Sequence, residues 1–174
     1  MPRYTQKEVE CRVFTFKEGL LSKVAHDLEL DVGDLELEWD DARTSLSARF
    51  GARSLKVLHP MHDGRPNPSA LSDRDKHKIE ETIQGEVLHT SRWPDIRFRS
   101  SAIELTGESA ATIRGTLELC GKSRELTAHA RREGGRWITE LTLHQPDYGI
   151  TPYSAMLGTL RIQKDVRVRL SVPA

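Results

Sequence analysis

The chain has 174 residues, enough for one domain with a sizeable core, and its 26 Lys and Arg residues balance its 26 Asp and Glu residues. A net charge of zero argues against a general nucleic-acid-binding protein, because such proteins are usually distinctly basic. No apolar run reaches the roughly 18 residues of a membrane helix, and the first residues do not resemble a secretion signal. We therefore expect a single cytoplasmic domain over residues 1–174, with Cys11 and Cys120 as free thiols.

Apolar and polar residues alternate through the first third of the chain. The alternation over residues 24–39 is interrupted by Gly33 and Asp34, which predicts two half-buried strands around a turn. It resumes over residues 44–58. Residues 59–70 contain three prolines and one glycine and therefore predict an exposed loop.

One helix is expected over residues 72–88. Ile79, Ile83 and Val87 recur at spacing i, i+4 and i+8, which is typical of one apolar helix face. Ser72 or Asp73 can cap the start of this helix.

The second half of the chain returns to an alternation of period two. We count about eight or nine strands in all. They are mostly joined by short turns that leave no room for crossover helices, so we expect an antiparallel sheet. The apolar faces of such strands must be buried together, either in two packed sheets or in a closed barrel.

The sequence Gly121-Lys122-Ser123 has the ending of a phosphate-binding P-loop, but its surroundings do not fit one. A P-loop needs a glycine at position 116, which is Thr116, and a helix after the loop. Residues 124–130 alternate as a strand instead. We therefore interpret the segment as a hairpin turn and expect no nucleotide there.

The expected pairing of this hairpin places Leu119 opposite Leu126 and Leu117 opposite Ala128, all on one face. Residues 121–124 are then a four-residue loop, a length commonly built around a type I turn. The next hairpin turns at Gly134 and Gly135 and pairs Ala128 with Leu141. Both hairpins assign the same face to the interior.

Three segments in this order resemble the YceI-like family, the polyisoprenoid-binding lipocalin-like barrels. Residues 93–98 (WPDIRF) match an aromatic-Pro-x-Ile-x-Phe strand, and residues 115–124 (GTLELCGKSR) match a Gly-x-Leu-x-x-x-Gly-x-x-Arg hairpin. Residues 147–150 (DYGI) match an Asp-aromatic-Gly-Ile corner. The resemblance is good over residues 85–172, whereas the first half matches in its pattern of elements.

The resemblance implies an all-β fold, an eight-stranded antiparallel lipocalin-like β-barrel with one amphipathic helix near one end. It also implies storage or transport of a long isoprenoid-type lipid in an apolar interior, by a binding protein that is not an enzyme and needs no cofactor. An eight-stranded barrel can be filled by side chains or can hold a small ligand, so each inward residue could instead simply fill the core. The candidate ligand-binding residues are Phe98, Ile113, Leu117, Leu119, Leu126, Leu141, Leu143, Tyr148, Tyr153 and Val168.

Two functions other than lipid binding stay open. The alternative is a ligandless scaffold or protein-interaction barrel, with a homodimer through the apolar segment 147–158. An enzyme with His26 as a base is a third hypothesis, although no Ser-His-Asp or Cys-His arrangement supports it. His59, His62 and Asp63 lack accepted metal-ligand spacing, so we expect no metal.

Overall fold

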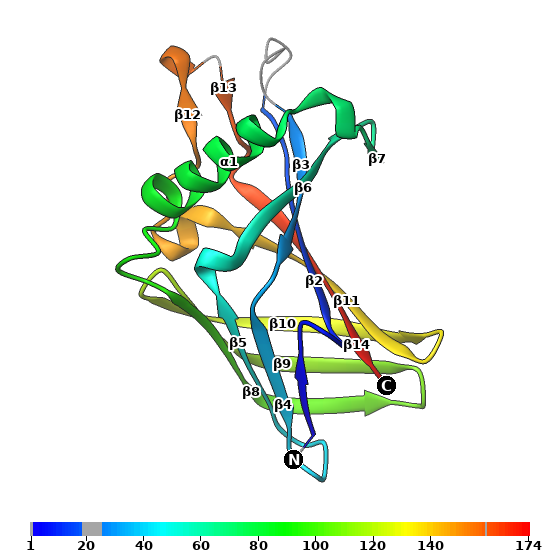
Figure 1. Ribbon diagram of the computed structural model, residues 1–174. Coiled ribbons are helices and arrows are strands. Elements are labelled where there is room, and N and C mark those ends of the chain that lie inside the picture. The colour runs from blue at the N-terminus through cyan, green and yellow to red at the C-terminus, as the bar shows by residue number, and fades with distance from the viewer. Residues whose placement is uncertain (1, 19–25, 159) are drawn as a thin grey trace.

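The structure is a computed structural model that describes residues 2–18, 26–158 and 160–174. Its main feature is one antiparallel sheet of twelve strands that curls strongly on itself, with a helix lying across one end (Figure 1). The strand order in this sheet is β1-β4-β5-β8-β9-β10-β11-β14-β2-β3-β6-β7. Its strands are β1 (Arg3–Thr5), β2 (Glu10–Thr15), β3 (Asp27–Val32), β4 (Leu35–Trp39), β5 (Leu46–Gly51), β6 (Leu55–His62), β7 (Arg65–Pro66), β8 (Asp95–Thr106), β9 (Ala110–Leu119), β10 (Lys122–Glu133), β11 (Arg136–His144) and β14 (Asp165–Pro173).

The remaining elements lie between these strands. Two short strands, β12 (Ser154–Ala155) and β13 (Leu160–Arg161), form a separate sheet. The α-helix α1 (Asp73–Thr82) continues as the π-helix η3 (Ile83–Val87), and four short 3-10 turns are η1 (Ala52–Ser54), η2 (Pro68–Ala70), η4 (Gln145–Tyr148) and η5 (Met156–Gly158).

The prediction of an all-β fold with one helix is confirmed, but eight strands in a closed barrel are not. The difference comes from bends in long alternating stretches. For example, β3 and β4 follow each other through Gly33 and Asp34, yet β3 pairs with β2 and β6 while β4 pairs with β1 and β5. β5 and β6 are likewise separated by η1, so one stretch of alternation becomes two strands. Residues 24 and 25, predicted to start the strand before Gly33, lie outside the described residues.

The helix prediction is confirmed in position and in its cap. The Ser72 hydroxyl accepts the Asp75 N–H at 3.1 Å, and the Asp75 carboxylate accepts the Ser72 N–H in return, which forms a capping box. After Thr82 the helix widens, and the Leu88 N–H donates to the Ile83 carbonyl oxygen at 2.8 Å. The expected loop over residues 59–70 was wrong in part, because β6 extends to His62 and pairs with β7.

The register predicted for the first hairpin was wrong. Leu119 pairs with Lys122, and Leu126 pairs with Gly115, so the loop is the two residues Cys120 and Gly121. Both have positive φ, 51° and 74°, which suits a tight two-residue hairpin turn. A non-glycine residue with positive φ is uncommon, and the sequence therefore favoured a longer loop. The change in register is an even number of residues, so the predicted inward face is kept.

The turn and register of the second hairpin were predicted correctly, but the predicted pair of Ala128 with Leu141 does not form. It turns at Gly134 and Gly135, which have φ of 55° and 75°. Glu133 pairs with Arg136, and the same register continues to Ala130 and Thr139. Beyond that pair no further β10–β11 pairing is present among the described residues.

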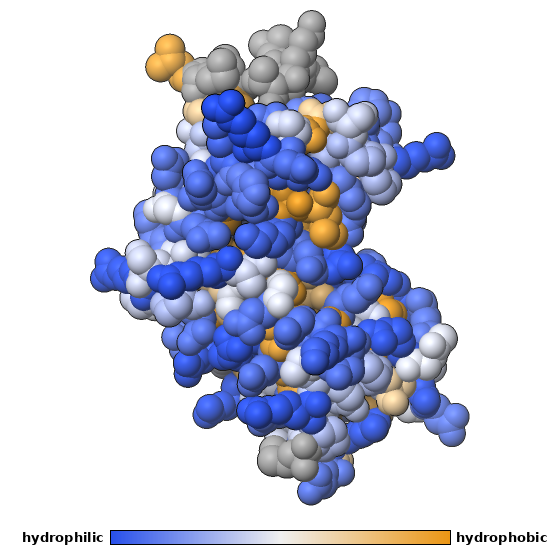
Figure 2. Space-filling view, viewed as in Figure 1, coloured by the Kyte–Doolittle hydropathy of each residue, from blue (hydrophilic) through white to orange (hydrophobic). Residues whose placement is uncertain are grey.

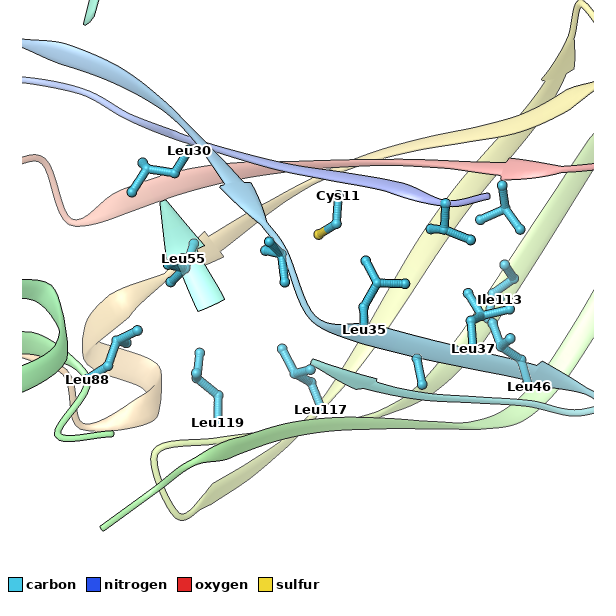
Figure 3. Close-up of a cluster of buried hydrophobic side chains, with 14 of the residues drawn as sticks. Cys11, Leu30, Leu35, Leu37, Leu46, Leu55, Leu88, Ile113, Leu117 and Leu119 are labelled. Atoms are coloured by element: carbon cyan, nitrogen blue, oxygen red, sulfur yellow. The ribbon is translucent and has the colours of Figure 1, made fainter. Parts of the chain in front are cut away.

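Buried leucines line the inner face of the curled sheet. Leu30 and Leu35 are 1% and 0% exposed, respectively. Figure 3 shows Leu35, Leu37 and Leu46 pointing into the interior, where Ile113 of β9 also lies. The core therefore joins strands that are far apart in the sequence, and it positions the walls of the site described next.

Candidate functional site

A cavity of about 600 Å³ lies between the inner face of the curled sheet and the helix pair α1–η3. This volume falls within the range of about 300–1,000 Å³ for pockets that hold small molecules. Its walls are mainly Leu, Ile, Val, Phe and Ala side chains from both halves of the chain. Such a surface favours an apolar ligand through the hydrophobic effect.

The structure brings together all ten of the predicted site residues on the wall of this cavity. They come from five long strands, from η4 and from the residue before β12. Whether they bind a ligand stays a prediction. On the wall are Phe98 of β8, Ile113, Leu117 and Leu119 of β9, Leu126 of β10, Leu141 and Leu143 of β11, Tyr148 of η4, Tyr153, and Val168 of β14.

The prediction missed the wall formed by the first half of the chain. Leu28 and Leu30 of β3 line the cavity, as do Ile79, Ile83 and Val87 of the helix pair. Both signals were present in the sequence, as the alternation after residue 26 and as the apolar stripe of the helix.

The opposite end of the interior is filled by side chains. Several fully buried apolar residues are not on the cavity wall, and most belong to the strand ends near the Gly134–Gly135 turn and the C-terminal end of β14 (Figure 1). The interior is thus hollow at the helix end and packed at the other. The packed residues are Val9, Leu35, Ala111, Ala130 and Val172.

The Phe98 ring lies across a glycine of the neighbouring strand. A Cβ atom at Gly115 would lie 2.5 Å from Cζ of Phe98 and 2.4 Å from the carbonyl oxygen of Arg99. A side chain at Gly115 would therefore push the ring or the backbone. Glycine at this position fixes how far the ring enters the cavity.

The three segments used for the resemblance meet at one corner. The Trp93 ring covers the β9–β10 turn, because a Cβ atom at Gly121 would lie 2.5 Å from its Cη2. After the turn, the Arg124 Nε donates to the carbonyl oxygen of Asp147 at 3.0 Å. Gly149 follows with φ of 68° and turns the chain away from η4. The motifs thus build the frame that holds Tyr148.

Tyr148 is buried at this corner with 4% exposure. Burial raises the pKa of its hydroxyl, and the nearby Asp147 carboxylate raises it further. Among the described residues no hydrogen-bond partner of this hydroxyl is found. The phenol is therefore neutral at physiological pH and can offer a hydrogen bond to a polar group of a ligand.

Polar groups on the wall are few. Within the described residues, Lys78 is the one permanently charged residue of the wall, and no Asp or Glu lines it. The Thr15 hydroxyl is buried on the wall without a hydrogen-bond partner in this part of the chain. His26 also reaches the wall, whereas Asp27 accepts the N–H of Lys17 at 2.8 Å.

The histidines considered as metal ligands have other neighbours. His59 Nε2 lies 2.7 Å from Oε2 of Glu29, and His62 contacts Asp63 at 3.3 Å. The described part of the chain holds no group of three His, Cys, Asp or Glu residues that could bind a metal ion.

The face of the molecule shown in Figure 2 is mainly hydrophilic. Two large apolar side chains are exposed among the described residues, Leu105 at 62% and Leu157 at 106%. Within the segment 147–158, in contrast, Tyr148 and Ile150 are buried. In this same part of the chain, no helix has the length and apolar character needed to cross a membrane.

Comparison with known families gives one match over nearly the whole chain. The profile of the YceI-like domain matches residues 4–174. A comparison with curated proteins found no match.

Solved structures show a similar fold. BcnA from Burkholderia cenocepacia superposes with a TM-score of 0.66 at 14% identity, over 95% of this chain and 96% of that chain. A polyisoprenoid-binding domain from Saccharophagus degradans, implicated in plant cell wall breakdown, gives 0.57 at 10% identity over 95% and 94%. The YCEI protein from Campylobacter jejuni gives 0.57 at 15% identity over 84% of each chain. At these identities the likeness concerns the fold alone.

Proposed function

This chain belongs to the YceI-like domain family, and from that premise we propose that it stores or transports a long isoprenoid-type lipid held in its apolar cavity. The observation that carries the proposal is the cavity wall, where apolar side chains of the sheet face those of α1 and η3. Each Å² of apolar surface removed from water contributes about 25 cal/mol, so a hydrocarbon chain needs continuous lining rather than specific contacts.

The shape of the sheet supports the proposal. β14 pairs with both β11 and β2. If β1–β2, β3–β4 and β5–β6 are each counted as one bent strand, the pairings pass through eight strands and return to the first. We infer an eight-stranded barrel in this sense, with the lipid chain lying along its interior.

The first test is extraction and loading. Purified protein is extracted with organic solvent for mass spectrometry, and lipid-free protein is then loaded with a polyprenol. We expect one polyprenol bound per chain. Lipid-free protein that binds no polyprenol under any loading condition would refute the proposal.

A matched pair of variants localises the lipid. Leu126→Trp places a larger ring on the cavity wall, whereas Leu105→Trp adds the same ring at an exposed position near the end of β8. We expect the first to reduce polyprenol binding severalfold and the second to leave it unchanged. Urea unfolding of both variants checks that the loss is not caused by unfolding.

The alternative is a ligandless barrel that acts through protein contacts, as a homodimer through residues 147–158. The exposed Leu157 favours it, whereas the buried Tyr148 and Ile150 leave little apolar surface in that segment for a partner. Light scattering tests this alternative. A protein that stays monomeric at high concentration would rule out the homodimer.

We also propose a cytoplasmic location. Cys11 and Cys120 are free, which suits a reducing compartment. Cell fractionation tests this, and recovery of the protein outside the cytoplasm would refute it.

A further inference from the structure

An apolar side chain stands free at the end of the molecule that holds the cavity. The described residues 153–158 and 160–162 form a flap that contains β12, η5 and β13. Its base belongs to the cavity wall through Tyr153, Leu160 and Ile162, and the Ile162 N–H donates to the Tyr153 carbonyl oxygen at 3.0 Å. Its tip carries Leu157, which is 106% exposed. In Figure 2 an apolar protrusion rises from the surface at this end.

The conformation of the tip keeps this leucine away from the protein. Leu157 has φ of 56° and ψ of 33°, a left-handed conformation that is unfavourable for a residue with a side chain. Leu105, the other exposed leucine among the described residues, lies at the β8–β9 end of the sheet, far from the flap (Figure 1). Both leucines are exposed but lie at different ends of the molecule. Substituting each in turn therefore distinguishes the effect of exposure from the effect of position.

Positive charge accompanies the tip. Residues 151–164 contain Arg161 and Lys164 but no Asp or Glu. The backbone of Lys17 pairs with that of Ile162 in an isolated antiparallel β-bridge at the base of the flap. These three side chains are exposed, and the described residues include no carboxylate within ion-pair distance of any of them. Three acidic residues are neighbours of these side chains. The Glu18 N–H donates to the Arg161 carbonyl oxygen at 2.9 Å, and Asp27 accepts the Lys17 N–H at 2.8 Å. Asp165 follows Lys164 and pairs with His144 at 2.6 Å, so Arg161 is the basic residue that the flap itself carries without an adjacent acidic residue in sequence.

Resting on the proposed function, we propose that the flap docks this end of the protein on an anionic lipid bilayer, with Leu157 inserted among the acyl chains. Basic residues beside an apolar tip match the negative surface of such a membrane. A second copy of the chain fits less well, because paired flaps would bring like charges together. Docking in this way places the cavity wall at Tyr153 and Leu160 next to the source of its lipid.

Vesicle co-sedimentation tests whether the flap binds to an anionic bilayer. Wild-type protein is mixed with vesicles of phosphatidylcholine alone and with vesicles containing one third phosphatidylglycerol. We expect binding to the anionic vesicles that weakens in high salt. Leu157→Asp is expected to reduce this binding at least tenfold and the matched control Leu105→Asp to leave it unchanged. Lys164→Gln removes one exposed charge and is expected to reduce anionic binding about fivefold.

The outcomes separate docking from lipid binding itself. Leu157→Asp is expected to take up polyprenol from cyclodextrin as the wild type does, but more slowly from anionic vesicles. Equal losses in the Leu105 and Leu157 variants, or no vesicle binding by the wild type, would overturn docking. So would a dimer in solution that only Leu157→Asp dissociates. If neither the wild type nor Leu157→Asp takes up polyprenol from cyclodextrin, the proposed lipid-binding function fails. The co-sedimentation result would still show whether the flap docks on a membrane.

Discussion

The division of the interior into a packed end and a hollow end predicts different costs for the same substitution. Leu35 is 0% exposed and lies outside the cavity wall. Leu35→Ala removes three carbon groups worth about 0.8 kcal/mol each and leaves a void that adds about 1–2 kcal/mol. We expect a loss of about 3–4 kcal/mol in the free energy of unfolding. Leu141 already faces the cavity, so Leu141→Ala creates little new void and is expected to cost about 1 kcal/mol.

Urea unfolding of lipid-free protein measures both losses, followed by circular dichroism and tryptophan fluorescence in parallel to check two-state behaviour. Leu105→Ala, at an exposed position near the end of β8, serves as the control and is expected to change stability by less than about 0.5 kcal/mol. Equal losses for Leu35→Ala and Leu141→Ala would show that the interior is uniformly packed. The assignment of a ligand cavity would then be wrong.

Three further substitutions or reactions test other parts of the structure. Gly115→Ala forces the adjacent phenylalanine ring or backbone to move and is expected to cost about 1–3 kcal/mol in unfolding experiments, and an unchanged stability would contradict the close packing. Ser72→Ala removes the helix cap and is expected to cost about 1 kcal/mol at neutral pH. The Ser72 hydroxyl and N–H lower the pKa of Asp75 below its ordinary 3.8, so this carboxylate stabilises the folded state above that pH and the benefit is lost as the pH falls through the lowered value. Acid titrations monitored by circular dichroism should therefore show a shallower loss below about pH 4 in Ser72→Ala, and identical acid profiles would contradict the capping box. Burial raises the pKa of Cys11 to about 12, whereas Cys120 is half-buried with a raised pKa, so iodoacetamide at pH 8 should label Cys120 first, as mass spectrometry of peptides would show.

The two hairpins at residues 120–121 and 134–135 differ in how well their registers could be predicted from the sequence. Two glycines at 134–135 can both adopt positive φ, and the register that they predict is the one observed. At the first hairpin Cys120 takes the position that a glycine or asparagine usually occupies, so the turn could not be identified from residue preference. The inward face was still correct, because alternation determines which side of a strand is apolar whatever its partner.

Strand number and cavity wall were harder to predict. Nothing in the alternation over residues 27–39 indicates that the two sides of Gly33 pair with different neighbours. The wall residues of the second half were identified, but their inward orientation alone does not separate a packed position from a hollow one. That distinction depends on how far the helix lies from the sheet, a distance that involves residues remote in sequence.

The pairing of β14 with β2 also has a consequence for how the protein is made. Residues 10–15 receive one of their neighbours only from residues 167–171. During synthesis, one edge of β2 and one edge of β11 stay without a partner until β14 has left the ribosome. Unpaired edges invite association with other chains, and contacts so distant in sequence form slowly. The interval before the last strand arrives is therefore when the nascent chain most depends on chaperones.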